Sequence, residues 1–216
     1  MDIWNFFTSF IVQSIAFLTH EVGVGEAVAI ILFTLIGRLV LMPINLLAMA
    51  NMYRNKKAIS ALKPELDKIK VIHKDKPNEI AKSTMALYKK NNIKILDKKS
   101  VINIASQGVF GFGMFQALQQ IVFNSKFAWI ANIAKPDVAL ALLVGVITYF
   151  SMIMMPGSAE QTSTLLFIIP AIICIITLIS FPSAIGLYWA TSSVTSLLQS
   201  LVLNNYFQKR EINKAI

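Results

Sequence analysis

Residues 27–52 read AVAIILFTLIGRLVLMPINLLAMANM, and this stretch decides the fold class. Arg38 is its only charged residue. A helix needs about 20 mostly apolar residues to cross a bilayer, so this run is long enough to span a membrane. The chain as a whole has the same character, because 56% of its 216 residues are hydrophobic and only 14% are charged, against about 25% charged in soluble domains. We therefore expect an all-α polytopic membrane protein.

Uncharged runs farther along the chain predict four more spans. Residues 100–125 and 138–159 carry no charge, and neither do residues 161–208. The last run is too long for one membrane helix, and Pro182 interrupts it, because a proline inside a helix removes a hydrogen bond and clashes with the preceding turn. The sequence therefore predicts five membrane-spanning helices, at residues 23–51, 100–124, 137–155, 163–180 and 184–205.

The basic residues predict how these spans are oriented. Of the 20 Lys and Arg residues, 14 lie within residues 52–99 and three more lie within the tail at residues 206–216. Cytoplasmic segments of membrane proteins carry an excess of Lys and Arg, and an even number of predicted spans separates the two basic segments. We expect both segments to be cytoplasmic and the N-terminus to lie outside.

Two segments outside the spans have helical patterns. Residues 1–22 place polar and aromatic side chains at helical spacing, which favours a helix lying in the outer membrane interface; a sixth span is the alternative. The basic cytoplasmic segment holds two amphipathic stretches, near residues 59–69 and 80–88, with Asp75 as a cap and Pro77 in a first turn. This pattern predicts a helical hairpin, whose lysines either mark the topology or also contact acidic partners.

Arg38 is the most informative single residue. It lies about 16–18 Å from either end of the apolar stretch at residues 27–50, at 1.5 Å per residue. Insertion scales assign a central arginine a cost of about 2.5–3.5 kcal/mol, and the uncharged runs at residues 100–125, 138–159 and 161–208 contain no carboxylate that could pair with it. We therefore expect Arg38 to face a hydrophilic groove within the bilayer. The alternative is that it binds backbone carbonyls or lipid phosphate.

Polar residues at helical spacing extend this candidate groove. Ser and Thr alone are weak evidence because they commonly mediate helix packing in membranes, but beside an unpaired arginine they favour a wet groove. The residues that we assign to it from their positions are Thr34, Arg38, Asn45, Gln107, Thr148, Ser151, Tyr188, Ser192 and Thr195. Three glycines of the second span, Gly108, Gly111 and Gly113, are interpreted as sites of close packing.

Four strings of this sequence resemble the YidC/Oxa1/Alb3 membrane protein insertases. They are residues 27–52 quoted above, LKPELDKIK at 62–70, KDKPNEIAKSTMALYKKNNI at 74–93 and FPSAIGLYWATSSVTSLLQSLVLNNYF at 181–207. The resemblance implies five core helices around a hydrophilic groove that is open to the cytoplasm and to lipid. It also implies that Arg38 and Thr34 lie in this groove and that Trp189 faces the substrate.

One part of the chain departs from the family's pattern. Residues 95–116 read ILDKKSVINIASQGVFGFGMFQ, without the prolines that family members usually have in and before the second core span. The resemblance therefore does not fix where that span begins. Residues 1–22 lack the features of a transit peptide, so we expect a bacterial plasma (inner) membrane protein.

The function that the resemblance implies is the insertion and folding of integral membrane proteins through the groove that contains Arg38. The alternatives are a partner-dependent assembly chaperone and a small transporter or channel. The sequence has no P-loop, no nucleophile–base constellation and a lone Cys174, so we expect no enzyme activity, cofactor or metal site.

The expected partners are nascent or newly made membrane proteins and membrane lipid. The ribosome and the Sec translocon are candidate partners, because the basic cytoplasmic segment can contact acidic surfaces. We expect no recognition of nucleic-acid sequence, since the membrane topology already accounts for where the positive charge is concentrated.

Overall fold

Helices form nearly all of the regular structure in the part of the chain that the computed structural model describes, which is residues 2–74, 76–94, 97–155 and 167–215. Within these residues the elements are α1 (Ile3–His20), α2 (Glu26–Ala61), α3 (Lys63–Ile72), α4 (Pro77–Lys90), α5 (Lys98–Gln120), α6 (Val138–Ile153), α7 (Ile168–Ser180) and α8 (Ser183–Ala215). The described residues form no strand beyond one isolated bridge between Phe127 and Ile130. The fold is therefore all-α.

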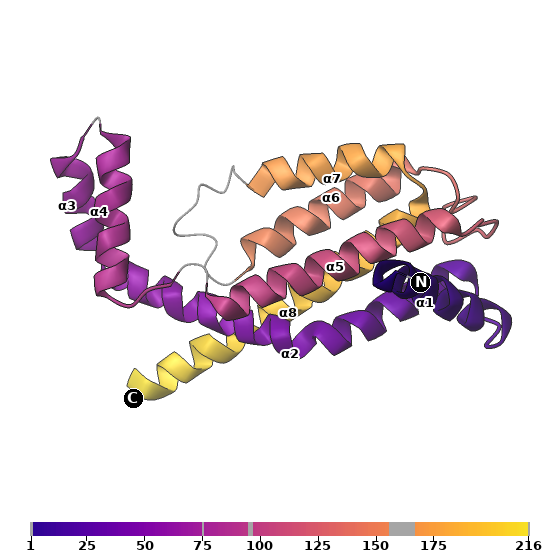
Figure 1. Ribbon diagram of the computed structural model, residues 1–216, viewed down its shortest axis with the longest axis horizontal. Helices are drawn as coiled ribbons and strands as arrows, with labels where there is room; N and C mark the ends of the chain where they lie inside the picture. The colour runs from indigo at the N-terminus through magenta and orange to yellow at the C-terminus, as the bar shows by residue number, and fades with distance from the viewer. Residues whose placement is uncertain (1, 75, 95–96, 156–166, 216) are drawn as a thin grey trace.

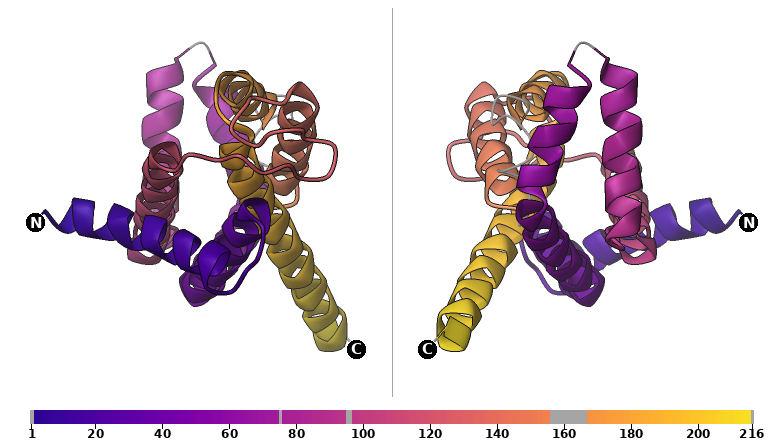
Figure 2. Two further views of the ribbon diagram at one scale, coloured as in Figure 1. Left: turned by 90° about the vertical axis from the view of Figure 1, so that its right-hand side faces the viewer. Right: turned by 90° about the vertical axis from the view of Figure 1, so that its left-hand side faces the viewer.

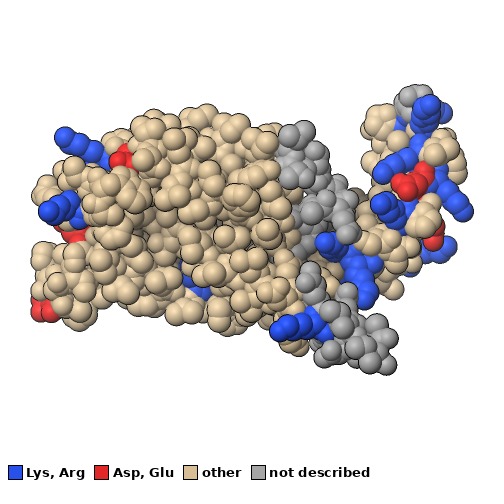
Figure 3. Space-filling model, turned by 180° about the vertical axis from the view of Figure 1, so that it is seen from behind, with Lys and Arg blue, Asp and Glu red and all other residues tan. Residues whose placement is uncertain are grey.

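The arrangement has three parts. Helices α2, α5, α6, α7 and α8 run lengthwise as an elongated bundle, and the α3–α4 hairpin projects from one end of it (Figure 1). Helix α1 lies across the opposite end instead of along the bundle (Figure 2). Charged side chains gather at the two ends, and the body between them is nearly free of charge on the face seen in Figure 3. This distribution fits a bundle whose middle is surrounded by hydrocarbon.

The surface of the bundle is apolar where a soluble protein would be polar. Helices α2 and α5 are long and apolar enough to cross a membrane, and α6 and α7 are shorter apolar helices. Their outward side chains remain exposed, for example Val40 of α2, Ile104 of α5, Val146 of α6 and Ile176 of α7. Contiguous exposed apolar surface on this scale needs a lipid environment, so the chain is a membrane protein.

Two helices run beyond the spans predicted for them. Helix α2 continues through Ala61 for 36 residues, about 54 Å, and so joins the first predicted span to the start of the basic segment. It ends just before α3, where Pro64 supplies no backbone N–H and its ring cannot fit against the preceding turn. Helix α8 likewise continues to Ala215, through most of the predicted tail.

Two sequence-based expectations touch residues that the structure does not describe. Residues 163–166 of the fourth predicted span lie outside the described residues, and the helix α7 begins at Ile168. Asp75, the predicted cap of the second hairpin helix, also lies outside them; the helix begins with Pro77 in its first turn, as the sequence predicts.

Helices α2 and α8 are parallel and pack in a constant register. Arg38 donates to Ser192, 154 residues later, and Asn45 donates to Gln199, also 154 residues later. The next contact repeats the offset, because the stacked rings of Tyr53 and Phe207, with centroids 4.2 Å apart, also differ by 207 − 53 = 154. Contacts that recur at about seven residues are typical of a coiled-coil seam, so these two helices form one paired unit.

The other bundle helices attach to this pair on opposite sides. Helix α6 packs extensively on both α7 and α8, whereas α5 packs on α1 and α2 and only lightly on α8. Gly145 allows the close approach of α6 to α7, because a Cβ at this position would overlap the side chain of Ile175. Helices α5 and α6 do not form an extensive contact with each other. A gap between these two walls is the consequence.

The connection between α5 and α6, residues 121–137, is itself packed into the fold. Its side chains Phe123, Ile130 and Ile133 are buried. The carboxylate of Glu26 accepts the backbone N–H groups of Asn124 and Ser125 at 3.1 and 3.0 Å. The same segment supplies backbone carbonyls that accept N–H groups from the start of α8, which satisfies donors that a helix leaves unpaired at its first turn.

The three glycines of α5 have different surroundings, and one of the three expectations of close packing was wrong. A Cβ at Gly113 would overlap the ring of Phe7 in α1, and one at Gly111 would lie 3.1 Å from the hydroxyl of Tyr188. Gly108, by contrast, has no atom within 4 Å of such a Cβ. It faces open space and is not a packing site.

This contrast gives a test of how α1 is attached. Replacing Gly113 with Leu should displace Phe7 and loosen α1 from α5, at a cost of about 1–3 kcal/mol, the usual range for overpacking. The matched variant Gly108→Ala should not lower stability, since open space surrounds the added methyl group. Thermal unfolding of the detergent-solubilised protein measures both. Equal midpoints for the two variants would contradict the packing of α1 described here.

Candidate functional site

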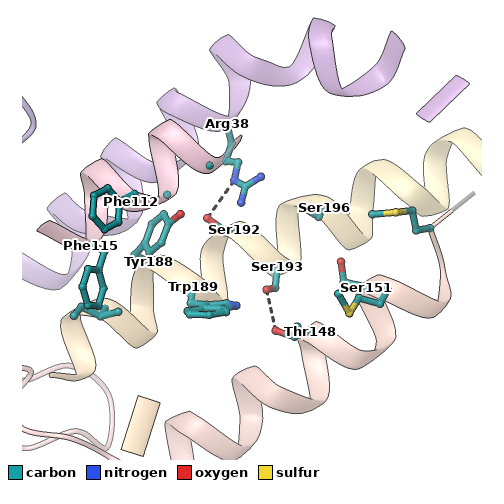
Figure 4. A pocket seen from close by; sticks show the side chains of 15 residues that line it. Arg38, Phe112, Phe115, Thr148, Ser151, Tyr188, Trp189, Ser192, Ser193 and Ser196 are labelled. Carbon is teal, nitrogen blue, oxygen red and sulfur yellow. Dashed lines mark hydrogen bonds between the residues drawn. The ribbon is translucent and has the colours of Figure 1, made fainter. Parts of the chain in front are cut away.

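A pocket of about 510 Å³ lies in the gap between α5 and α6, with α8 behind it and Arg38 of α2 at one edge. Figure 4 shows the side chains that line it. The α5 wall consists of Gly108, Gly111, Phe112 and Phe115. The absence of a side chain at Gly108 leaves room in this wall, because nothing else fills the space where a Cβ would project.

Arg38 is held by side chains from two other helices. Its Nε–H donates to Ser192 Oγ of α8 at 3.1 Å, and its Nη1 donates to Gln107 Oε1 of α5 at 2.5 Å. Arginine has five N–H donors, so three of them have no partner among the described residues. Both acceptors are neutral, and the guanidinium therefore keeps its full positive charge beside the pocket. Figure 4 shows it next to Ser192.

The nearest carboxylate on the same helix is already engaged. Glu26 begins α2, twelve residues before Arg38, which is about 18 Å along the helix axis. Its carboxylate accepts backbone N–H groups of the segment between α5 and α6. Arg38 therefore has no acidic partner on α2, and the pocket lining of described residues contains no acidic side chain.

A second polar group lies on the α6 side of the pocket. Thr148 of α6 and Ser193 of α8 share a hydrogen bond of 3.1 Å between their hydroxyls (Figure 4). Ser151, one turn along α6, also lines the pocket. The pocket therefore has a cation on its α2 side, hydroxyls on its α6 side, and apolar side chains between them.

Aromatic rings form the end of the pocket farthest from the hairpin. Tyr188 and Trp189 of α8 point into it together with Phe112 and Phe115 of α5 (Figure 4). Tyr188 is 9% exposed, and its ring packs edge-on against Phe110 with centroids 6.3 Å apart. Rings of this kind can contact an apolar helix without forming specific polar bonds, because their faces are large and rigid.

The structure brings together six of the ten residues that the sequence assigned to the groove. Those that line the pocket are Arg38, Thr148, Ser151, Tyr188, Trp189 and Ser192. Thr34 does not line it; the residue is fully buried and donates to the carbonyl of Ile30. Thr195 donates to the carbonyl of Thr191 within its own helix. These two hydroxyls donate to backbone carbonyls of their own helices, and neither residue lines the pocket.

The remaining two candidates, Gln107 and Asn45, do not line the pocket either. Gln107 accepts from the guanidinium, and Asn45 lies two turns farther along α2, where it donates to Gln199 and accepts from Asn103 at 3.4 Å. Both belong to the contact of α2 with α5 and α8.

Several residues that line the pocket were not among the candidates predicted from the sequence. Ser193 and Ser196 lie one position over from the predicted polar stripe of α8, and Met152 and Met155 complete the α6 side. The adjacent serines at 192 and 193 were a usable signal, because neighbours in a helix face about 100° apart, and a pair of them predicts two polar faces. Phe112 and Phe115 gave no such signal, since aromatic residues are common on lipid-facing surfaces.

The described residues give no indication of a metal centre, because they contain no group of three or more His, Cys, Asp or Glu side chains placed to hold an ion. Cys174 is buried beside Thr148, with its sulfur 3.9 Å from the hydroxyl. What the arrangement offers is a cation with spare donors at the edge of a pocket bounded by apolar rings and hydroxyls. It can bind an acidic or polar chain segment within an apolar body.

Comparison with known proteins shows which family this chain resembles. The family model described as "60Kd inner membrane protein" matches residues 17–210. The chain is 28% identical over 193 residues to a protein of Clostridium tetani named membrane protein insertase YidC, with 87% of this chain and 85% of the relative covered.

Two further relatives show similar coverage. A membrane protein insertase YidC of Oceanobacillus iheyensis is 27% identical, with 94% of this chain and 84% of the relative covered. Membrane protein insertase MisCA of Bacillus subtilis is 28% identical, with 88% and 75% covered. The matched region covers α2 to α7, including the hairpin, and most of α8, and the chain therefore belongs to the 60Kd inner membrane protein family, which is the YidC/Oxa1 family.

Proposed function

We propose that this protein inserts newly made integral membrane proteins into the membrane and assists their folding. The observation that carries the proposal is Arg38, a cation with neutral partners and spare N–H donors at the edge of a pocket inside an apolar bundle. A fixed charge in such a place is costly and marks a functional site. The relatives named as membrane protein insertases support the same function.

The proposed topology has five spans with the basic hairpin and the tail in the cytoplasm and the N-terminus outside. Its spans are α2, α5, α6, α7 and α8, and the Lys- and Arg-rich residues 52–99 mark the cytoplasmic side. Helix α1 would lie in the outer interface, an orientation that its crosswise placement supports (Figure 2). Its exposed aromatic side chains Phe6, Phe10 and Phe17 would then enter the lipid.

In the proposed mechanism the pocket is part of a hydrophilic groove open to lipid and to the cytoplasm. The segment of the substrate that must cross the membrane enters this groove first. A carboxylate in this segment would accept from the unused donors of Arg38, as paired charges do in low dielectric. Arg38 thereby lowers the desolvation cost that an acidic segment pays on entering the bilayer.

Movement of the substrate's apolar helix into the lipid is the last step of insertion. Its helix leaves between α5 and α6 past Tyr188 and Trp189, and it enters the lipid. Transfer of apolar surface out of water, at about 25 cal/mol per Å², supplies the free energy. The membrane potential can additionally favour outward movement of acidic residues. No nucleotide hydrolysis is required by these steps.

The partners follow from this mechanism. Newly made membrane proteins are the substrates, and membrane lipid receives them. The α3–α4 hairpin, with Lys70 and Lys82 among its exposed basic side chains, would contact acidic surfaces at the cytoplasmic mouth. Anionic lipid, the ribosome and the Sec translocon are the partners that this charge would attract.

The charge of Arg38 can be tested by reconstitution. Proteoliposomes that hold only this protein should insert a single-span substrate with a short acidic outer tail, scored by protease protection. Arg38→Ala should lower insertion about tenfold, which corresponds to about 1.4 kcal/mol, whereas Arg38→Lys should keep much of the activity because it keeps the charge.

Other results of this reconstitution experiment would contradict parts of the proposal. Equal and complete loss in the Lys and Ala variants would contradict a role based on charge alone. Insertion that Arg38→Ala leaves unchanged would remove Arg38 from the mechanism. No insertion by the folded wild-type protein would favour an assembly chaperone that needs a partner, and ion flux from the same vesicles would favour a channel.

The volume of the pocket can be tested separately from its charge. Gly108→Phe should fill the space that this glycine leaves in the α5 wall and reduce insertion of acidic and neutral tails alike. Val109→Phe is the matched control, because it adds the same ring to the neighbouring exposed position outside the pocket lining. Similar insertion by the two variants would contradict a route through this pocket.

A further inference from the structure

Two polar layers are stacked between α2, α5 and α8, and each layer takes one side chain from each helix. The first layer is Arg38, Gln107 and Ser192. The second layer is Asn45, Asn103 and Gln199, in which Asn45 donates to Gln199 and accepts from Asn103 at 3.4 Å. Every member of the second layer is an uncharged amide. Only the first layer reaches the pocket.

The two layers have a fixed geometric relation. From the first to the second, α2 and α8 each advance seven residues, about 10.5 Å, while the antiparallel α5 goes back four residues, about 6 Å. The second layer therefore fixes the height and rotation of all three helices just beyond the guanidinium. A polar residue at one position of a helix seam is the best-attested device for setting register.

The second layer is not arranged as a ligand site. None of its three residues lines the pocket. Asn103 Oδ1 is buried and has no hydrogen-bond partner among the described residues, although its Nδ2 is bonded. Since a buried amide oxygen without a hydrogen bond is unfavourable, the unpaired acceptor of Asn103 favours a role for this layer beyond adding stability.

We infer that Asn45, Asn103 and Gln199 are positioning residues that hold the guanidinium of Arg38 toward the pocket. The inference deepens the proposed function and rests on it. Arg38 is anchored to α5 through Gln107 and to α8 through Ser192. Each anchor lies four or seven residues from an amide of the second layer, so a rotation or slide of either helix that breaks the second layer also moves an anchor of the first.

This positioning role predicts which substrates lose insertion when the second layer is removed. A misplaced guanidinium loses its contact with the carboxylates of a substrate, but the pocket still accepts an uncharged tail. Loss of the second layer should therefore reduce the preference for acidic over neutral tails and leave insertion of neutral tails nearly unchanged. A purely structural role would lower both to the same degree.

The experiment measures this preference in proteoliposomes for substrates that differ only in their outer tail, acidic or neutral. Gln199→Met and the double variant Asn45→Leu with Gln199→Met remove the amides at similar volume. The acidic-to-neutral ratio should fall about threefold or more, within the range by which residues that act through others change coupling. The exchanged pair Asn45→Gln with Gln199→Asn, which keeps an amide pair, should restore it.

A control on the same seam isolates the polar contribution. Phe207→Leu removes the ring stacked on Tyr53, eight residues beyond Gln199, without touching either polar layer. It should leave the tail preference unchanged. All variants are first compared with the wild type for folded yield in detergent.

The outcomes separate this inference from the proposed function. Failure of the wild-type protein to insert either tail would overturn the proposed function itself. Wild-type preference for acidic tails that survives in the double variant would overturn the positioning role alone. An equal loss for both tails, with no rescue by the exchanged pair, would also overturn it, since the amides would then serve stability only.

Discussion

A guanidinium within an apolar bundle is the constraint on which the rest of this structure depends. Arg38 has to be kept hydrogen-bonded, because an unsatisfied charge at membrane depth is far more costly than any single packing defect. Serine and glutamine side chains from two other helices provide those bonds. Acceptors without charge leave the arginine positive, whereas a carboxylate would have neutralised it. Three helices are therefore tied together by a contact that is also the proposed functional centre.

The remaining architecture can be understood as support for that contact. The α2–α8 pair forms the centre of the bundle, with α6 and α7 packed on one side and α5 and α1 on the other. Because α5 and α6 belong to different sides, the space between them is filled by neither. The pocket thus results from which helices are paired, and a single small residue, Gly108, widens it.

Much of the fold and of the candidate site could be predicted from the sequence. The features that could not be predicted have a common physical cause, which is their dependence on the tertiary arrangement. Arg38 stood out because charge is rare in an apolar run, and six assigned residues line the pocket because polar side chains at helical spacing share a face. Thr34 and Thr195 could not be separated from them, since a hydroxyl that bonds its own helix looks the same in sequence as one that faces water. Gly108 faces open space whereas Gly113 faces Phe7 of α1, and this difference is a property of the tertiary arrangement. The packed segment at 121–137 depends on distant partners such as Glu26.

The equal spacing of seven residues between the two polar layers in α2 and in α8 limits where the length of this protein can change during evolution. One residue inserted between Arg38 and Asn45 would turn everything after it by about 100°, so the two polar layers could no longer form together. The α3–α4 hairpin lies outside both layers, so its helices can lengthen or shorten without altering either. Relatives of this chain should therefore differ in size at the hairpin, while the spacing of seven residues inside the paired helices stays free of gaps.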